Sequence, residues 1–376
     1  MTISWRPRTR WRWLVMLAAV AVLVALPGLV QALPAPTASV SATTLLTRIQ
    51  HSGGVAYSGY AEADGGLDLP VTNQFTGIAD LFGGHTQLRV WWRGSHDWRV
   101  DSIGYTGETD LHMTDQGWWT WNYESNTATF SQQTADPRVR LPNDSDVLPP
   151  PLTRRLLSEA RPDEVSSIAS ARVAGENAAG LRVRPDEPNS TVDHIDVWAD
   201  TATGLPLRVV VHGKGSASPA MSSSFLDVSV GMPAAATTRF ELPPRVTVES
   251  GGAQDLASAL DSLGATTLPG TLAGIARNPE LPGVGTVGIY GRGVTEFAVV
   301  PLPRRIAFTL RDELSKVADT GTKNDPGQLA VSSGPLNLLI SSFDAPAGPW
   351  LLIGTVTAST LTAAAQTLPD RPRIGR

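Results

Sequence analysis

Short runs of alternating apolar and polar residues dominate the chain from residue 51 to residue 250. The runs are rich in β-branched and aromatic residues, and clusters of Gly, Asp, Asn or Ser separate them. Alternation with a period of two is typical of a strand that buries one face. The pattern therefore predicts a meander of antiparallel strands, the first of which lie at residues 51–60, 76–81, 87–92, 98–105 and 111–114.

The tryptophan-rich strands indicate which side chains point inward. Six of the eleven tryptophans lie between residues 91 and 121. A period of two places alternate residues of LRVWWR, WRVDS and WWTWNY on one face, which we expect to be strongly aromatic. Rings of this size can fill a core or form the wall of an apolar cavity. The candidate cavity residues on these strands are Leu88, Val90, Trp92, Trp98, Val100, Trp119, Trp121 and Tyr123.

A second group of strands follows in the sequence. The segments TVDHIDVWAD and LPLRVVVHG flank a polar turn at residues 200–204, which predicts a hairpin. SSFLDVSV and residues 238–248 continue the strand pattern until Gly251 and Gly252 interrupt it. The inward positions predicted on the hairpin, which complete the candidate cavity, are Ile195, Val197, Leu207, Val209 and Val211.

Helices are predicted at only a few places. Residues 43–49 form an amphipathic pattern that Ser41 can cap. After the proline run 149–151, TRRLLSEA and PDEVSSIAS predict one or two short helices lying across the sheet. Beyond residue 250 the predicted order is αα, ββ, α, ββ, α. Its helices are expected in LASALDSL, LPGTLAGIA and residues 304–317, and its first hairpin runs from TVGIYGRG to TEFAVVPL.

The N-terminal residues predict export from the cytoplasm. Arg6, Arg8, Arg10 and Arg12 precede an uncharged apolar stretch at residues 13–33. A basic segment followed by an apolar one is typical of a signal peptide, and Val30-Gln31-Ala32 has the small residues that signal peptidase accepts. An uncleaved segment would instead anchor the chain in the cytoplasmic membrane, with the arginines inside. Either way, the remainder of the chain is expected to face outward.

Composition narrows the choice of partners. The net charge is −5 for 376 residues, and no dense basic stripe follows the N-terminus, so we expect no nucleic-acid partner. Cysteine is absent, which excludes disulfides, thiolate metal sites and an N-terminal lipid-modified cysteine. Abundant Gly and Pro with only 17% charged residues favour short strands joined by turns.

The sequence offers little catalytic chemistry. The six histidines show neither HExxH nor helical pair spacing, so no metal is expected. Asp193 and His194 are neighbours on a strand, as are His96 and Asp97, and side chains of neighbours point to opposite faces. No GxSxG motif is present, and Gly291-Arg292-Gly293 is explained by a hairpin turn. We therefore predict no enzymatic activity and no cofactor.

An alternative interpretation involves acidic residues near the tryptophans. Aromatic walls combined with carboxylates are found where proteins bind or hydrolyse sugars. The spacing here matches no specific arrangement of that kind. The acidic residues concerned are Glu108, Asp110, Asp115 and Glu124.

The order HIDVWADTATGLPLRVVVHG, SSFLDVSV, TTRFELPPRVTV resembles the closing strands of the LolA and RseB lipoprotein-carrier-like fold. The resemblance implies an incomplete antiparallel β-barrel wrapped around short helices, whose concave apolar interior takes up acyl chains. VGIYGRGVTEFAVVPL and GPWLLIGTVTASTLTAAAQTL resemble the start and the end of the smaller second domain of the RseB, or MucB, branch. The resemblance covers most of residues 43–368, although PLPRRIAFTLRDELSKV is longer and more helical than that pattern.

These observations predict an α+β, mostly β protein. Residues 1–40 are a signal peptide or membrane anchor, 41–250 a LolA/RseB-like half-barrel, and 251–376 a small RseB-like α+β domain. We expect an extracytoplasmic protein that binds the acyl chain of a lipid or lipoprotein, and the resemblance implies a sigma-factor regulator that grips a membrane-bound anti-sigma factor. Two alternatives stay open: a LolA-like carrier without a signalling role, and a structural envelope protein whose tryptophans only pack a core.

Overall fold

The fold is described here from a computed structural model of the whole chain. It describes residues 16–17, 40–67, 81–104, 107–132, 142–251, 267–279, 287–317, 327–343 and 348–369. The predicted signal peptide or anchor, residues 1–40, lies almost wholly outside these ranges. Among the described helices, none is both long enough and apolar enough to span a bilayer.

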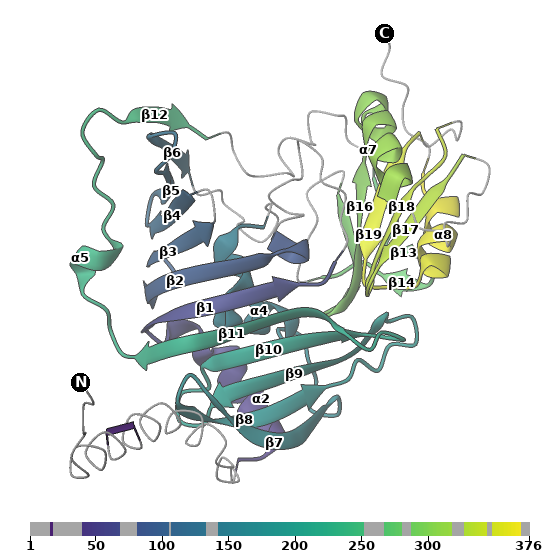
Figure 1. Cartoon of the computed structure of the whole chain (residues 1–376). Helices are drawn as coiled ribbons and strands as arrows, with labels where there is room; N and C mark the ends of the chain where they lie inside the picture. The colour runs from purple at the N-terminus through teal and green to yellow at the C-terminus, as the bar shows by residue number, and fades with distance from the viewer. Residues whose placement is uncertain are drawn as a thin grey trace, which may run out of the picture.

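A twelve-stranded sheet forms most of the molecule (Figure 1). Its strand order is β12-β6-β5-β4-β3-β2-β1-β11-β10-β9-β8-β7, so its two edges do not meet and the sheet is not a closed barrel among the described residues. Neighbouring strands are antiparallel apart from β12 and β6, which run parallel. The strands are β1 (Tyr57–Gly65), β2 (His85–Gly94), β3 (Asp97–Gly104), β4 (Gly107–Thr114), β5 (Gly117–Asn122), β6 (Thr127–Gln132), β7 (Val165–Val173), β8 (Glu176–Val183), β9 (Val192–Asp200), β10 (Pro206–Gly213), β11 (Pro219–Val230) and β12 (Thr247–Ser250).

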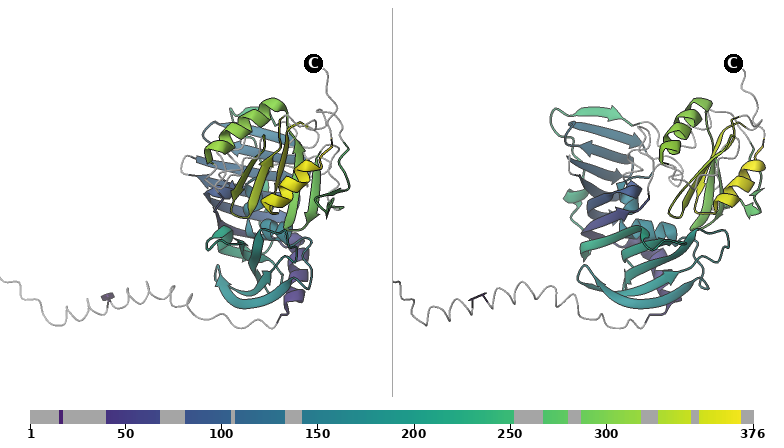
Figure 2. Two further views of the ribbon diagram at one scale, coloured as in Figure 1. Left: turned by 90° about the vertical axis from the view of Figure 1, so that its right-hand side faces the viewer. Right: turned by 45° about the vertical axis from the view of Figure 1, so that its right-hand side comes forward.

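Short helices lie inside the curve of this sheet (Figures 1 and 2). They are α2 (Ala42–His51), η1 (Ser52–Gly54), η2 (Asp144–Val147) and α4 (Pro149–Leu156). Ser41 caps α2, as predicted, by accepting a hydrogen bond from the Thr44 amide at 3.2 Å. The apolar stripe of α2 and the buried Leu152 of α4 join the inward side chains of the sheet in one core, because each helix has only one apolar face to bury.

A strap formed by residues 231–251 crosses the outer face of the sheet. It leaves the end of β11 in the middle of the sheet, carries the short helix α5 (Ala235–Thr238) past β2 and β3, and reaches the edge as β12 (Figure 1). His112 Nδ1 lies 2.9 Å from the Thr238 carbonyl, and Asn126 donates to the Arg245 carbonyl at 2.9 Å. The strap therefore covers part of the outer face.

The C-terminal part forms a separate five-stranded antiparallel sheet in the order β15-β16-β19-β18-β17. Helix α7 lies on the side nearer the large sheet and α8 on the other side (Figure 2). Each helix packs in its own apolar cluster. The elements are β13 (Thr271–Leu272), β14 (Ile275–Ala276), β15 (Gly288–Arg292), β16 (Thr295–Pro301), α7 (Arg304–Val317), β17 (Leu329–Ser333), β18 (Leu336–Ile340), β19 (Trp350–Gly354) and α8 (Ala358–Gln366).

The predicted fold class is confirmed: the protein is mostly β, with an open curved sheet around short helices and a smaller α+β part. The 200–204 hairpin and the 304–317 helix are also confirmed. The strand predicted at 51–60 begins only at Tyr57, because α2 and η1 continue to Gly54. The expected helix in LASALDSL and nearly all of the 76–81 strand lie outside the described residues.

Two predicted helices are strands instead. PDEVSSIAS contributes to β7, where Val165 pairs with Val183, and Ser166 and Ser167 are exposed. Val165 and Ile168 are three residues apart, which favours a helix locally, but pairing with β8 overrides this spacing, and the register shifts between Ile168 and Ala171. LPGTLAGIA forms the β13–β14 hairpin, because Ala273 and Gly274 adopt φ values of 49° and 77°. A two-residue turn of that left-handed type favours Gly and does not continue a helix.

Candidate functional site

The concave face of the large sheet carries a stack of aromatic rings. The Tyr57 and Trp92 rings are 6.0 Å apart and nearly parallel, and Trp92 stacks on Trp98 at 5.3 Å. Phe225 meets the edge of Tyr57 at 5.7 Å. These side chains come from β1, β2, β3 and β11, which are neighbours in the sheet, so the cross-strand register brings the rings together.

Three hydrogen-bond donors lie at this stack with no hydrogen-bond partner among the described residues: the Tyr57 hydroxyl, Trp92 Nε1 and Arg154 Nη1. We call these three residues the donor cluster. Tyr57 is completely buried, and Trp92 is 7% exposed. The Arg154 guanidinium, which α4 supplies, lies 6.0 Å from the centroid of the Trp92 ring. Buried polar groups are almost always hydrogen-bonded in native proteins, so this cluster calls for a complementary group.

Burial sets the ionisation of the cluster. It raises the pKa of Tyr57, and the nearby Arg154 charge only partly opposes that rise. Burial also lowers the pKa of Arg154 from its high ordinary value, while Tyr57 opposes the fall. No acidic side chain of the described residues lies within ion-pair distance of Arg154. Within the part of the chain that the structure describes, the site therefore presents a neutral phenol and a cation without a carboxylate partner.

Ten of the candidate cavity residues are buried on this concave face. Val90 pairs with Val100, and Val209 pairs with Val197. Their side chains pack with α2 and α4 in the same core. The ten are Leu88, Val90, Trp92, Trp98, Val100, Ile195, Val197, Leu207, Val209 and Val211. Whether they contact a ligand stays a prediction.

The register corrects the predicted position of the other three. Met113 pairs with both Trp98 and Trp118, so Trp118 shares the concave face with Trp98, and Trp119 and Trp121 lie on the outer face. Trp119 stacks on Phe240 of the strap at 5.0 Å. Tyr123 is 50% exposed in the turn after β5. The prediction of one shared aromatic face was wrong, because alternation assigns faces within a strand and only the register relates one strand to the next.

The acidic residues near the tryptophans belong to the outer face. Arg99 binds Asp101 at 2.5 Å and Asp110 at 2.7 Å, and its guanidinium lies 5.2 Å from the centroid of the Trp91 ring. Burial and the neighbouring Asp101 charge raise the pKa of Asp110 to about 7. One Arg99 guanidinium thus serves two carboxylates, and this ion-pair network accounts for the position of Asp110. The sugar-binding alternative, which names Asp110, Glu108, Asp115 and Glu124, stays a prediction.

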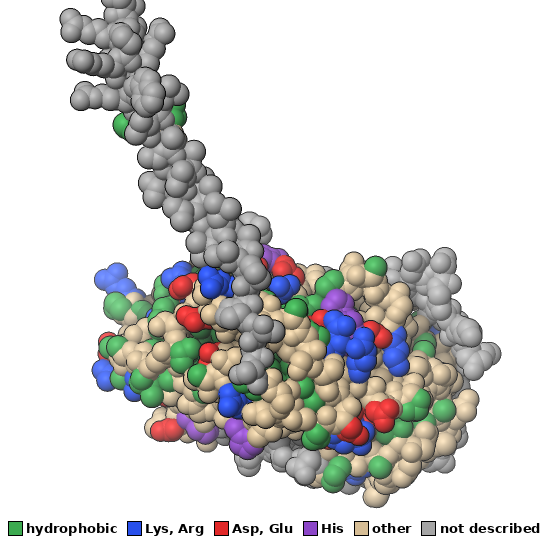
Figure 3. Space-filling model, turned by 90° about the horizontal axis from the view of Figure 1, so that it is seen from below, with side chains coloured by type: hydrophobic (Ala, Val, Ile, Leu, Met, Phe, Trp, Pro, Cys, Tyr) green, Lys and Arg blue, Asp and Glu red, His purple; other side chains and the backbone are tan. Residues whose placement is uncertain are grey.

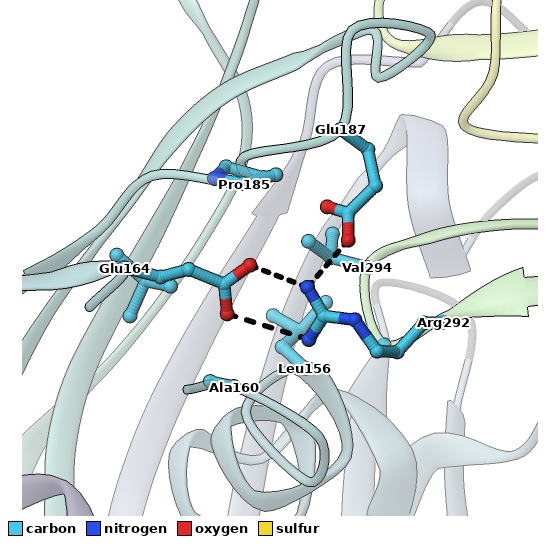
Figure 4. Close-up of a pocket in the computed structure, with 9 residues that line it drawn as sticks. Leu156, Ala160, Glu164, Pro185, Glu187, Arg292 and Val294 are labelled. Atoms are coloured by element: carbon cyan, nitrogen blue, oxygen red, sulfur yellow. Dashed lines mark hydrogen bonds and ion pairs between the residues drawn. The ribbon is translucent and has the colours of Figure 1, made fainter. Parts of the chain in front are cut away.

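A second cluster joins the two sheets at the β15–β16 turn (Figure 4). Arg292 reaches the large sheet and binds Glu164 at 2.5 Å, and it also binds Glu187. Arg292 Nη1 donates to the Glu159 carbonyl at 2.6 Å, and Val294 packs against the large core. Burial alone would raise the pKa of Glu164, but hydrogen bonds from Arg292 and the Arg161 amide outweigh it and hold the pKa low. Arg292 therefore clamps the small sheet onto the large one.

The cleft beside this clamp is too small for an organic ligand. Its free space is ≈ 10 Å³, about what one water molecule needs. Additional backbone bonds fix the junction: the Thr191 amide donates to Thr355 and the Thr357 amide donates to Asn189, each at 3.0 Å. This region is a joint between the two parts. No local pattern predicts it, because the two carboxylates that Arg292 binds are 105 and 128 residues away from it in the sequence.

Comparison with known proteins shows the fold. No protein-family model matches the sequence, and no curated protein is similar to it in sequence. The structure of the Pseudomonas aeruginosa MucA/MucB complex aligns with a TM-score of 0.50 at 16% identity, covering 88% of this chain and 99% of that one. A crystal structure of MucB with MucA(peri) gives 0.49 at 16% identity, with coverages of 88% and 99%. A LolA superfamily protein from Nitrosomonas europaea gives 0.25 at 8% identity, covering 54% of this chain and 99% of that one.

The alignment with the MucA/MucB complex extends over both sheets of this chain. The chain thus has a MucB-like fold, as the resemblance of its closing strands implied.

Proposed function

We propose that this protein is an extracytoplasmic binding protein that holds an acyl chain on the concave face of its large sheet, without catalysing a reaction. The observation that carries the proposal is the donor cluster of Tyr57, Trp92 and Arg154 in an apolar aromatic surround. Trp Nε1 and Arg can only donate hydrogen bonds, and the Tyr57 hydroxyl can also donate. The complementary group is therefore an acceptor, and the Arg154 charge favours an anionic or strongly polar one.

A fatty-acyl carboxylate or ester carbonyl combines such an acceptor with an apolar chain. The branched aliphatic side chains around Val90 and Val209 form an apolar environment for that chain. Each Å² of acyl-chain surface that leaves water there contributes about 25 cal/mol to the free energy of binding. Because Tyr57 is completely buried, a guest reaches the cluster when α4, which supplies Arg154, moves away from β10 and β11. Binding is thus coupled to a displacement of α4.

The proposal is tested by tryptophan quenching with 9,10-dibromostearate in residues 40–376, which contain both sheets. Bromine quenches only nearby indoles, so the wild-type protein should be quenched and Trp92→Phe should lose a large part of that quenching. Trp91→Phe is the matched control, because Trp91 is adjacent in sequence and lies on the outer face. Arg154→Leu should weaken binding at least about tenfold, given the cost of a lost charged hydrogen bond. Equal quenching in Trp92→Phe and Trp91→Phe would refute the proposed location.

A second candidate function is recognition of a membrane-bound anti-sigma factor. The MucB-like fold supports it, because MucB was solved in complex with MucA. In this chain, α7 lies on the side of the small sheet that faces the large one, and its Phe308 is 60% exposed. Large exposed apolar side chains are common in protein interfaces.

The test is interferometry against the extracytoplasmic segments of the anti-sigma factors of the same cell. We expect Phe308→Asp to lose binding while dibromostearate binding persists. Leu242→Asp, on an exposed residue of the strap, is the control and should bind normally. Failure of every segment to bind the wild-type protein would leave the carrier role as the better account.

A further inference from the structure

Two histidines and an aspartate meet on the outer face of the β9–β10 hairpin. His194 pairs with His212 across the hairpin, and Asp196 lies two residues along the same strand and hence on the same face. The two imidazole rings are 4.3 Å apart, and His194 Nε2 is 3.7 Å from Asp196 Oδ2. One potential ligand atom from each of the three residues lies within 4.8 Å of the others. No metal-binding motif in the sequence indicates this cluster, because the pairing register of the hairpin brings the three residues together.

The surroundings orient this trio as they do in metal sites. Asp193 Oδ2 lies 2.5 Å from His194 Nδ1, which leaves Nε2 of the same ring to face Asp196. A carboxylate on the far nitrogen of a ligating histidine is the usual outer-shell arrangement. Arg182 holds both Asp196 oxygens at 2.6 Å. Each oxygen keeps a further lone pair for another contact. The contact between Asp193 and His194 also corrects the expectation that neighbours on this strand stay apart.

Charged side chains of both signs surround the trio. Asp193 and Asp196 supply two negative charges near the trio, and Arg182 supplies one positive charge. The hydrogen bond from His194 and, to a smaller extent, Arg184 and Lys214 lower the pKa of Asp193. Counting these two residues, positive charges outnumber negative ones around the trio and reduce its affinity for a cation. Figure 3 shows histidine at the surface beside both basic and acidic side chains on the face seen from below.

We propose that His194, His212 and Asp196 form a binding site for a divalent transition-metal ion of the Zn²⁺ class. Two imidazole nitrogens and a carboxylate are a common three-ligand set for zinc, with the fourth position left to water. Tetrahedral zinc with bonds of about 2.0 to 2.1 Å holds its ligand atoms about 3.3 Å apart. His194 Nε2 and Asp196 Oδ2 are 3.7 Å apart, and the two imidazole rings are stacked at 17° to each other, so the rings must turn for a nitrogen of each to point at one ion. The site is independent of the acyl-binding proposal, because it lies on the opposite face of the sheet.

The test is calorimetric titration of Zn²⁺ into the full-length, tag-free chain, stripped of metal and kept in detergent. We expect one Zn²⁺ per chain in the wild type and binding weaker by roughly tenfold or more in His194→Ala and His212→Ala. His96→Ala, in the exposed β2–β3 turn, is the control and should bind as the wild type does. Co²⁺ in place of Zn²⁺ should give the visible absorption of a tetrahedral site in the wild type and not in the two variants.

Two results would overturn the proposal. One is the absence of stoichiometric Zn²⁺ binding by the wild-type chain. The other is unchanged binding in His194→Ala and His212→Ala, which would place the ion elsewhere. If either alanine variant unfolds, His194→Gln or His212→Gln keeps the side-chain volume, and the same titration decides the question.

Discussion

Replacing Tyr57 with phenylalanine should stabilise the lipid-free protein and weaken its hold on an acyl guest. The substitution removes one oxygen and keeps the ring, so the stack on Trp92 and the edge contact with Phe225 persist. The hydroxyl is completely buried and lacks a hydrogen-bond partner among the described residues. A buried unsatisfied hydroxyl costs about 1–3 kcal/mol, and we expect a gain of this size in the free energy of unfolding.

The same oxygen should favour the bound state. If it donates to the polar end of the guest, its loss removes a net hydrogen bond of about 0.5–1.5 kcal/mol, which corresponds to roughly twofold to twelvefold weaker binding. Urea unfolding of the delipidated protein measures the first effect, and dibromostearate titration measures the second. Tyr60→Phe is the matched control, since Tyr60 is on the same strand with the opposite phase and is only half-buried.

The two expected effects of Tyr57→Phe have opposite signs: the free energy of unfolding rises, and the affinity for the acyl guest falls. A structural tyrosine whose hydroxyl is satisfied would lose stability on replacement by phenylalanine. Thus a Tyr57→Phe variant that is less stable by 1 kcal/mol or more and binds dibromostearate as the wild type does would refute the reasoning.

Three further predictions concern packing, pH and the joint. Trp92→Ala should cost about 3–5 kcal/mol of unfolding free energy, measured in urea, and Trp91→Ala clearly less, because only Trp92 is buried in the core; equal losses would contradict this. Burial, partly opposed by Arg155 and reinforced by Glu159, raises the pKa of Glu296 to about 7. The free energy of unfolding of the wild type should therefore fall as pH rises from about 4.5 to about 7. In Glu296→Gln the melting temperature should depend less steeply on pH over this range, and parallel curves for the two proteins would contradict the prediction. Arg292→Ala should make the β15–β16 amides exchange hydrogen faster, because Glu164 and Glu187 lose their cation. Arg305→Ala, on the surface of α7, is the control and should leave this exchange unchanged. Equal protection in both variants would show that the clamp is dispensable.

The sequence was sufficient for the strands whose pattern is local. Alternation in TVDHIDVWAD and LPLRVVVHG assigned Val197 and Val209 to the buried face, and the polar turn between them set the hairpin. The same logic failed for WWTWNY, where aromatic residues occupy both phases and only pairing with β4 decides that Trp118 faces inward. Local alternation therefore predicts strands well but leaves their phase open where both faces are apolar.

Contacts between segments that are distant in the sequence could not be predicted from local patterns. Arg154 was predicted to lie on a helix near the sheet, but its position beside Tyr57 and Trp92 depends on how α4 packs inside the curve. The Arg292 clamp likewise depends on docking of the small sheet. The proximity of His194 and His212 could have been predicted, because the predicted hairpin places them opposite each other. Fixed motif spacings such as HExxH do not detect a pair that is formed by strand pairing.

Native mass spectrometry of the protein purified from cell membranes tests the central claim most directly. We predict a wild-type protein that carries a bound acyl lipid, an Arg154→Leu variant that has lost most of it, and an Arg155→Leu variant, altered at the exposed neighbour on the same helix, that retains it. A wild-type protein free of lipid, or equal lipid in all three proteins, would contradict the claim that the donor cluster holds an acyl guest.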